Sequence, residues 1–272
     1  MTMNQKRREA ALAKELLAAE KQEKKMQQAA LKAKPAVWKK ELESHIPEKV
    51  YAGLESAFCK GFGLVFDHGR AIIEKSYNKE DVQADYAIRD FAVKLKGGRN
   101  ELKQMHKSAK KSDLINMAVT TVEGVGLGAL GVGMPDIVLF LGNLLKGIYT
   151  TALNYGYDYE CRREQLLILK MMQTALSTGE SWIQRNAEVE QMLEFETVDI
   201  TDNLFKQQVK DTASAFAMDM LLLKFIQGLP IVGIIGGAAN PVYYGKVMKY
   251  VQLIYRKRYL LSKRSVNMSI EL

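Results

Sequence analysis

Apolar positions along this chain recur every three or four residues over long stretches. This is the spacing of one buried face of an α-helix, and no long stretch has the period of two that marks a half-buried strand. The pattern predicts one or two helices over residues 36–60, and single helices over residues 79–96, 157–178, 181–195 and 201–227. We therefore expect a mostly α fold, built as a single helical domain.

The helix expected over residues 79–96 has an apolar face that can be followed in the sequence. The positions that keep the 3.6-residue period are Asp81, Val82, Ala84, Asp85, Ile88, Phe91, Ala92 and Leu95. A helix in a globular protein usually turns such a face toward the core. The Gly97-Gly98 pair is expected to end this helix.

The first 34 residues form a charged arm that is rich in Ala, Lys, Glu and Gln, which are good helix formers. A 4-3 spacing runs through Leu12, Leu16, Ala19, Glu23, Met26, Ala30 and Ala33. Because Glu23 lies in this seam and most of the rest is Ala, a coiled coil would be weak, and we favour a solvated, fraying helix. With Pro35 marking the end of the arm, we divide the chain into the arm (1–34), a helical domain (36–264) and a tail (265–272).

Two apolar segments, 124–145 and 225–245, differ from the rest of the chain by their many glycines. Each is long enough to reach across a bilayer, but each is interrupted by Pro and Gly. Pro135 and Asn240-Pro241 are typical of helix starts, so we expect each segment to form a hairpin of two helical pieces joined by a tight turn. Pieces of about 10–15 residues would be roughly 15–22 Å long, short of the hydrocarbon core.

The glycines of these hairpins are candidates for close helix packing, because small residues four apart let two backbones approach. The predicted packing positions are Gly124, Gly128, Gly133, Pro135, Gly233, Gly237, Pro241 and Gly245. Three arrangements stay open: hairpins buried in the core of the domain, partial insertion into a membrane, and a constitutive span. The sequence leaves the oligomeric state open as well.

Residues 246–264 predict an amphipathic helix that follows the second apolar segment. Val247, Met248, Val251, Ile254 and Tyr255 share its apolar side. An apolar segment followed by aromatic and then cationic residues is expected where a protein meets the cytoplasmic face of a membrane. The candidate lipid-binding residues are Lys246, Lys249, Arg256, Lys257, Arg258, Lys263 and Arg264. The alternative is an ordinary surface helix.

Composition and charge narrow the class of protein. The 272 residues are 47% hydrophobic, which excludes a wholly disordered chain, and the net charge is +8. The excess of Lys and Arg lies in residues 1–34, 94–111 and 246–264. Such patches suit an anionic membrane surface or a nucleic acid. Because no nucleic-acid-binding motif accompanies them, we consider nucleic acid an unlikely partner.

No secretory signal opens the sequence, and the two cysteines, Cys59 and Cys161, cannot form a disulfide-rich scaffold. We therefore expect a cytoplasmic protein that lies peripherally at the inner face of the membrane. The chain has no zinc-ligand spacing, phosphate-binding loop or dinucleotide motif. No cofactor and no metal are expected.

Candidate catalytic groups are scarce. His45, His68 and His106 are far apart in the sequence and fit no metal or catalytic motif. The best remaining candidate is Asp67-His68-Gly69, where an acid beside a histidine could poise a proton acceptor. A helix-end Asp before a glycine turn explains the same residues without chemistry, so we lean against an enzyme.

Two stretches resemble the EcsC family. The stretch 126–172 has a glycine-rich turn, a Pro-Asp helix start and the sequence Tyr155-Gly156-Tyr157-Asp158, and the stretch 229–260 has a glycine-rich segment, an Asn and a helix ending in a basic cluster. The resemblance covers residues 36–264 and excludes the arm. It implies a bacterial, mostly helical protein that is cytoplasmic or attached to the membrane, and it brings no catalytic residues.

The leading hypothesis is a non-enzymatic protein that associates with membranes, contacts anionic lipid through basic faces and packs through its glycine-rich hairpins. One alternative is a soluble adaptor for a protein partner such as an ABC transporter subunit, because the EcsC family takes its name from a gene found beside an ABC transporter. The other alternative is a hydrolase with a site near Asp67-His68.

Overall fold

A computed structural model describes residues 3–33, 46–69, 73–118, 134–194, 200–226 and 239–269. Within these ranges the chain is helical and contains no strand, so the predicted mostly α fold is confirmed. The helices are α1 (Met3–Lys32), α3 (Glu48–Leu64), the π-helical turn η1 (Val65–Gly69), α5 (Lys79–Lys96), α6 (Arg99–Ala118), α7 (Met134–Asn154), α8 (Arg162–Leu176), α9 (Gly179–Glu194), α10 (Asp202–Ile226) and α11 (Ala239–Ser269).

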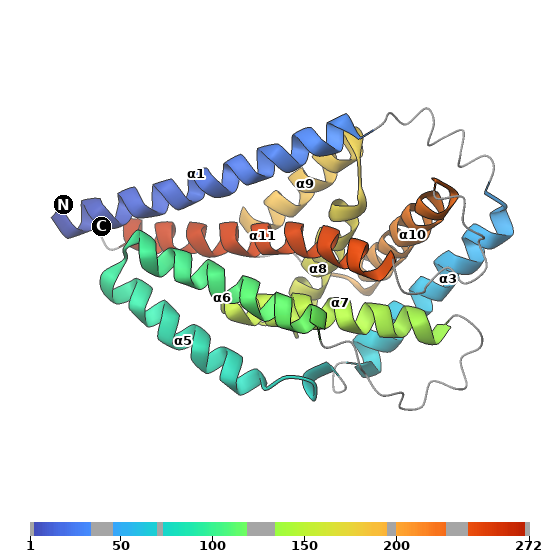
Figure 1. Ribbon diagram of the computed structural model, residues 1–272, viewed down its shortest axis with the longest axis horizontal. Coiled ribbons are helices and arrows are strands. Elements are labelled where there is room, and N and C mark those ends of the chain that lie inside the picture. Colours follow the sequence, from blue (N-terminus) through green and yellow to red (C-terminus); the bar gives the residue numbers. More distant parts are fainter. Residues whose placement is uncertain are drawn as a thin grey trace.

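The long helix α11 runs along the middle of the molecule and packs against α1, α6, α7 and α8 (Figure 1). Its predicted apolar side is buried, from Val247 through Val251 to Tyr255. The other side is covered too, because Gln252 and Leu253 are also buried. The helix is therefore a central element that is buried on more than one side, where the sequence suggested a surface helix with one basic face.

Helix α7 is the other central element and packs against α3, α5, α6 and α11. Its stretch Ile137–Asn154 is long and apolar enough to cross a membrane, but 78% of it is buried inside the protein, as in the core helix of a domain. At 21 residues, α7 is longer than the pieces of 10–15 residues that we predicted. The reason is that the apolar pattern continues past Gly142 and Gly147, where no helix break occurs.

The predicted hairpins fall largely outside the described residues. This applies to Gly124, Gly128, Gly133, Gly233 and Gly237. Helix α7 begins at Met134, so Pro135 lies in its first turn as expected. Helix α11 begins at Ala239, one residue before the predicted N-cap Asn240, and Pro241 lies in its first turn. Gly245 is exposed, and a Cβ there would meet no described atom within 4 Å, so no close packing involves it.

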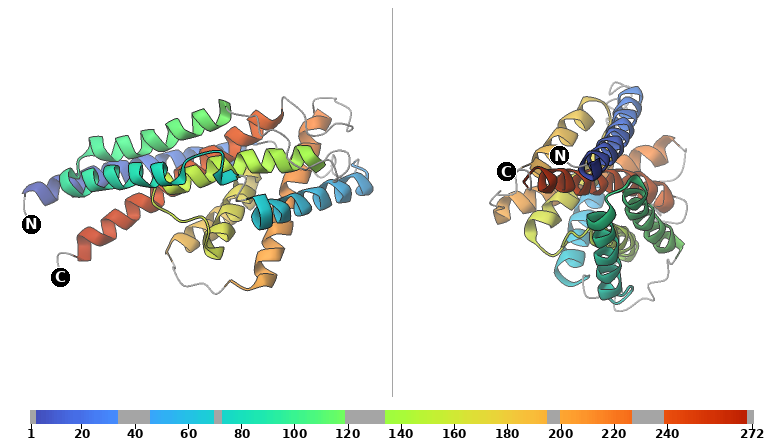
Figure 2. Two further views of the ribbon diagram at one scale, coloured as in Figure 1. Left: turned by 90° about the horizontal axis from the view of Figure 1, so that it is seen from below. Right: turned by 90° about the vertical axis from the view of Figure 1, so that its left-hand side faces the viewer.

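The arm is a helix, as predicted, but it is not solvated on all sides. α1 lies along α11 and also packs against α9 and α6 (Figures 1 and 2). The seam supplies the docked face, where Leu12, Leu16 and Ala19 are buried. Because most of the seam is Ala, α1 and α11 can approach closely. Glu23 does not disrupt this packing, because its carboxylate pairs with Lys257 of α11.

Helix α5 lies at the edge of the molecule and packs on α6 and α7 (Figure 1). We predicted that its apolar face would point toward the core, and this was wrong, because the large apolar side chains of that face are exposed. Ile88, Phe91 and Leu95 are 69%, 65% and 60% exposed. The docked face instead carries polar groups with partners on other helices, because Arg89 donates to Asn154 and Asp90 accepts from Tyr259. Gly97 ends the helix in the left-handed conformation, at φ 59°, as the Gly-Gly pair predicted.

Candidate functional site: the basic end of the molecule

The turn between α7 and α8 is the local centre of the fold. Tyr155 is buried, and its hydroxyl lies 3.0 Å from Nδ1 of His106. Gly156 has φ 81°, and a Cβ there would overlap the ring of Tyr86. Tyr157 stacks on Tyr255 with 5.7 Å between ring centroids. The Tyr-Gly-Tyr-Asp sequence thus packs the turn against α5, α6 and α11.

The cations at the end of α11 are bound to acids of the same chain. The guanidinium of Arg258 donates to both oxygens of Glu164, at 3.0 and 2.8 Å, and lies over the ring of Tyr157. Lys263 pairs with Asp90 at 2.5 Å. Burial works to raise the pKa of Asp90, but hydrogen bonds from Lys263, Lys94 and Tyr259 outweigh it and hold this pKa below its ordinary value. The Asp90 carboxylate is therefore charged at neutral pH.

Two acids of α1 cover the next two cations. Glu15 bridges Arg256, at 2.6 Å, and Arg99, at 2.7 Å. Glu23 accepts from Lys257 at 2.7 Å, while Glu190 of α9 pairs with Lys257 at 2.6 Å. Burial works to lower the pKa of Lys257, but these two carboxylates more than offset it, so the pKa is raised and the ammonium stays charged. The basic residues of α11 hold α1 and α9 in place.

These pairs change the picture of the candidate lipid-binding residues. Five of the seven form ion pairs within the molecule: the four described above, and Lys246, which pairs with Asp219 at 3.0 Å. The four are Arg256, Lys257, Arg258 and Lys263, whose side chains are only 11–18% exposed. Lys249 and Arg264 are exposed. Because a paired, half-buried cation has little charge left to offer a membrane, lipid contact has to be sought at other cations.

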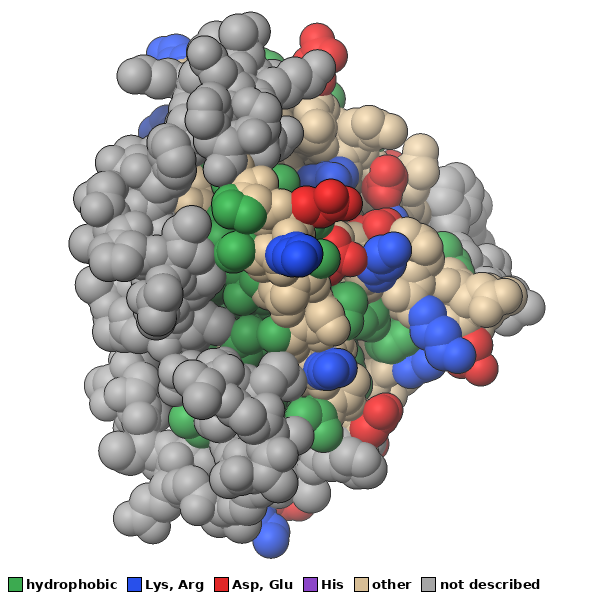
Figure 3. Space-filling view, turned by 90° about the vertical axis from the view of Figure 1, so that its right-hand side faces the viewer, with side chains coloured by type: hydrophobic (Ala, Val, Ile, Leu, Met, Phe, Trp, Pro, Cys, Tyr) green, Lys and Arg blue, Asp and Glu red, His purple; other side chains and the backbone are tan. Residues whose placement is uncertain are grey.

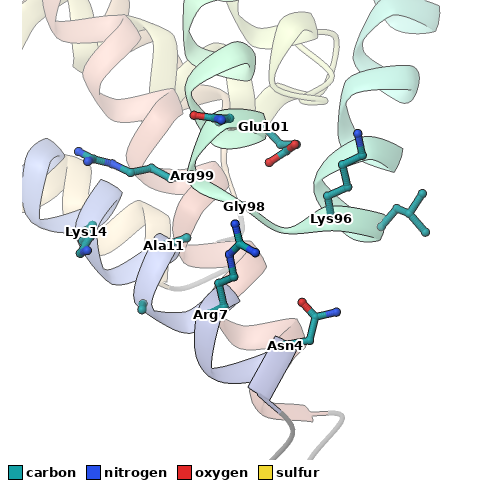
Figure 4. A pocket seen from close by; sticks show the side chains of 11 residues that line it. Asn4, Arg7, Ala11, Lys14, Lys96, Gly98, Arg99 and Glu101 are labelled. Carbon is teal, nitrogen blue, oxygen red and sulfur yellow. The ribbon is translucent and has the colours of Figure 1, made fainter.

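The start of α1, the end of α11 and the α5–α6 turn lie together at the left of Figure 1 and face the viewer in the right panel of Figure 2. The exposed cations on these elements include Arg7, Lys14, Lys96 and Arg264. We call this region the basic end. A cavity of about 660 Å³ opens there between α1 and the turn, lined by Asn4, Arg7, Ala10, Ala11, Lys14, Leu95, Lys96, Gly98, Arg99, Asn100 and Glu101 (Figure 4). Four of these residues are cations and one is an acid. We call it the basic cavity.

An apolar strip adjoins the basic cavity. Ile88, Phe91 and Leu95 are spaced three and four apart on α5, so they lie in one line on its outer side, and we call them the outer stripe. Leu95 belongs to both the stripe and the cavity lining. Lys94 and Lys96, both exposed, follow the stripe at the same end of the helix. The described part of the chain thus offers an apolar line with cations at its end.

The opposite end of the molecule has a different character. Its described surface carries Lys and Arg mixed with Asp and Glu, with no patch of a single sign (Figure 3). A second cavity, of about 1100 Å³, is lined by groups of both signs, including Lys170, Glu188 and Asp211. Lys170 and Glu188 already pair with each other at 2.6 Å. This cavity therefore shows no preference for a ligand of one charge.

Of the candidate catalytic groups, Asp67 and His106 have described side chains, whereas His45 lies outside the described residues. Asp67 is exposed in η1, and the side chain of His68 lies outside the described residues. His106 is turned into the core, where burial, helped by the charges of Arg256 and Lys110, lowers its pKa to about 4. Within the described ranges no group of three or more His, Cys, Asp and Glu is placed to hold a metal ion.

Sequence reasoning missed the features that define the basic end. The exposure of the outer stripe was not anticipated, although Tyr86, Arg89 and Asp90 on the other side of α5 were a sign that this helix carries polar anchors. The acids of α1 that pair with α11 were not anticipated either. Glu15 and Glu23 are eight residues apart, which places them on one side of a helix, and this spacing was the available signal.

Together these observations define a helical domain that is built around two central helices and has one basic end. Comparison with known proteins adds the family. A model of the EcsC protein family matches residues 10–260, so the chain belongs to this family. The match begins inside the arm, which we had expected to lie outside the resemblance.

Among curated proteins, Protein EcsC of Bacillus subtilis (strain 168) is 30% identical over 142 residues. The aligned region is 51% of this chain and 57% of that protein, so the comparison spans little more than half of the relative. No solved structure matches the chain.

Proposed function

We propose that this protein is a non-enzymatic, peripheral membrane-binding protein that docks its basic end on an anionic bilayer, at the cytoplasmic face. The observation that carries the proposal is the outer stripe beside exposed cations. Large apolar side chains that are more than half exposed and lie in one line mark an interaction surface. Amphipathic helices that bind membranes combine such a line with Lys and Arg.

The charges and the stripe would act together. Each Lys or Arg close to an anionic leaflet contributes about 1 kcal/mol, and each large apolar side chain that enters the interface adds a comparable amount. Arg7, Lys14, Lys96 and Arg264 are exposed and make no ion pair with a described residue, so they are available for this contact. The paired cations of α11 hold its neighbouring helices in place, α1 among them, and we assign these cations no direct contact with lipid.

Flotation of the purified protein with liposomes tests the proposal. We expect co-flotation with anionic but not with neutral vesicles, weakened by salt because exposed charges are screened. The triple variant I88S/F91S/L95S should partition at least tenfold less, since about 1 kcal/mol is lost at each position.

The matched control is L31S/I183S/L204S, which replaces three exposed apolar side chains outside the basic end. It should float like the wild type. An unaltered wild-type protein that floats with no vesicle under any salt condition would contradict the proposal and favour the alternative, an adaptor that binds a protein partner.

A further inference from the structure

The basic cavity lies between the first turns of α1 and the turn that joins α5 to α6 (Figure 4). Its lining carries Arg7, Lys14, Lys96 and Arg99 against the single acid Glu101. The net charge of the lining is therefore +3. Its volume of about 660 Å³ is that of a pocket for a small molecule or a headgroup.

The walls of the cavity are held together by contacts between lining residues and their neighbours. The guanidinium of Arg8 donates to the carbonyl oxygen of Leu95, which ties α1 to the end of α5. On the other side, Glu15 joins Arg99 of α6 to Arg256 of α11. A site whose walls are held in advance loses less entropy when a ligand binds.

Three of the four cations of the cavity have no counter-ion among the described residues, whereas Arg99 pairs with Glu15. Arg7, Lys14 and Lys96 make no ion pair with any described residue, whereas five of the seven cations of α11 do. In Figure 4, Arg7 rises from α1 toward Gly98, and Lys96 lies across from it at the end of α5. Like charges gathered in one hollow raise the local concentration of an anion.

We propose that the basic cavity binds a phosphate group, carried either by the headgroup of an anionic lipid or by a soluble phosphate ester. A phosphomonoester has a charge of about −1.5 to −2 at pH 7, which the lining can balance. Arg offers it two parallel N–H donors and Lys a point charge. Glu101 keeps the excess positive charge modest, so the site suits one phosphate group.

The lipid form of the ligand follows from the position of Leu95, which belongs to both the cavity and the outer stripe. A lipid with its phosphate in the cavity could lay its acyl chains toward Leu95 and Phe91. This form rests on the proposed membrane function, whereas binding of a soluble phosphate ester does not.

Isothermal titration with glycerol 3-phosphate tests the cavity without a membrane. We expect saturable binding to the wild-type protein, no comparable binding of acetate, and at least tenfold weaker binding to the double variant R7A/K96A. Both side chains are exposed, so the variant should fold, which thermal unfolding checks. The control K24A/K25A removes the same charge from exposed positions of α1 outside the cavity and should bind as the wild type does.

Flotation with vesicles that contain either phosphatidic acid or phosphatidylserine, matched for surface charge, separates the two sources of phosphate. A preference for phosphatidic acid that R7A/K96A loses and K24A/K25A keeps supports the lipid form. Binding of glycerol 3-phosphate without any flotation supports the soluble form and refutes the membrane function alone.

Two results would overturn the phosphate site. The first is no binding of glycerol 3-phosphate together with equal flotation of the two double variants, which would leave the membrane function intact. The second is an equal loss of binding in both double variants, which would show that only net charge matters.

Discussion

Gly156 shows how one residue fixes the turn between α7 and α8. Its φ of 81° belongs to the left-handed region, and the ring of Tyr86 fills the place of a Cβ. A residue with a side chain at this position would therefore strain the backbone and would also collide with Tyr86 of α5. The packing of Tyr155 and Tyr157 on either side depends on this glycine.

We expect Gly156→Ala to lower the free energy of unfolding by roughly 2–4 kcal/mol, the sum of backbone strain and overpacking. Urea unfolding followed by circular dichroism measures the loss. Gly142→Ala is the control, since a Cβ at this position would meet nothing within 4 Å. Because Ala favours a helix more than Gly does, this substitution should be neutral or should stabilise the protein by up to about 1 kcal/mol. Equal effects of the two substitutions would show that the turn is not restrained.

His106 should make the stability depend on pH. Its pKa is lowered to about 4 in the folded protein against 6.5 for the free side chain. The unfolded chain therefore binds a proton first as the pH falls, and the folded state loses about 2 kcal/mol between pH 7 and pH 5 from this group. Stability rises again as the pH returns to 7.

The variant His106→Gln, compared with the wild type over this pH range, isolates the contribution. The wild type should lose more stability toward pH 5 than the variant, because Gln takes up no proton. The comparison cancels groups common to both proteins, such as Glu190, whose pKa is raised by burial. Parallel pH profiles would mean that His106 is not held neutral.

At the scale of the element, α1 is fastened to the domain by ion pairs as well as by apolar contacts. Its docked face offers two leucines and several alanines, and Glu15 and Glu23 reach cations of α11. Burial works to raise the pKa of Glu15, yet hydrogen bonds from Arg99 and Arg256 outweigh it and lower this pKa. Glu15 therefore stays ionised and keeps Arg256 compensated.

We expect Glu15→Gln to destabilise the protein by about 3 kcal/mol, because it leaves the half-buried Arg256 without its counter-ion. The same urea unfolding experiment measures this. Glu20→Gln, at an exposed position of the same helix, should change the stability by less than about 0.5 kcal/mol. If the two variants are equally stable, α1 is not held by the Glu15 bridge.

At the scale of the whole molecule, the sequence allowed the fold class and most helices to be predicted, because a period of 3.6 residues needs no knowledge of partners. The apolar side of α11 was predicted for the same reason. The sequence did not tell which side of α5 faces the core, since Arg89 and Asp90 find their partners on α7 and α11, far away along the chain. The basic cavity has the same origin, because α1 and the α5–α6 turn meet only in the folded protein.

The start of α1 and the end of α11 lie together at the basic end (Figure 1). Any affinity tag or fluorescent protein fused to either end of the chain therefore emerges beside the outer stripe and the basic cavity. Such a tag would block access to this surface, and the fused protein would then show no binding even if the untagged protein binds a ligand. Experiments on this surface call for cleavable tags or for a reporter dye attached within the chain.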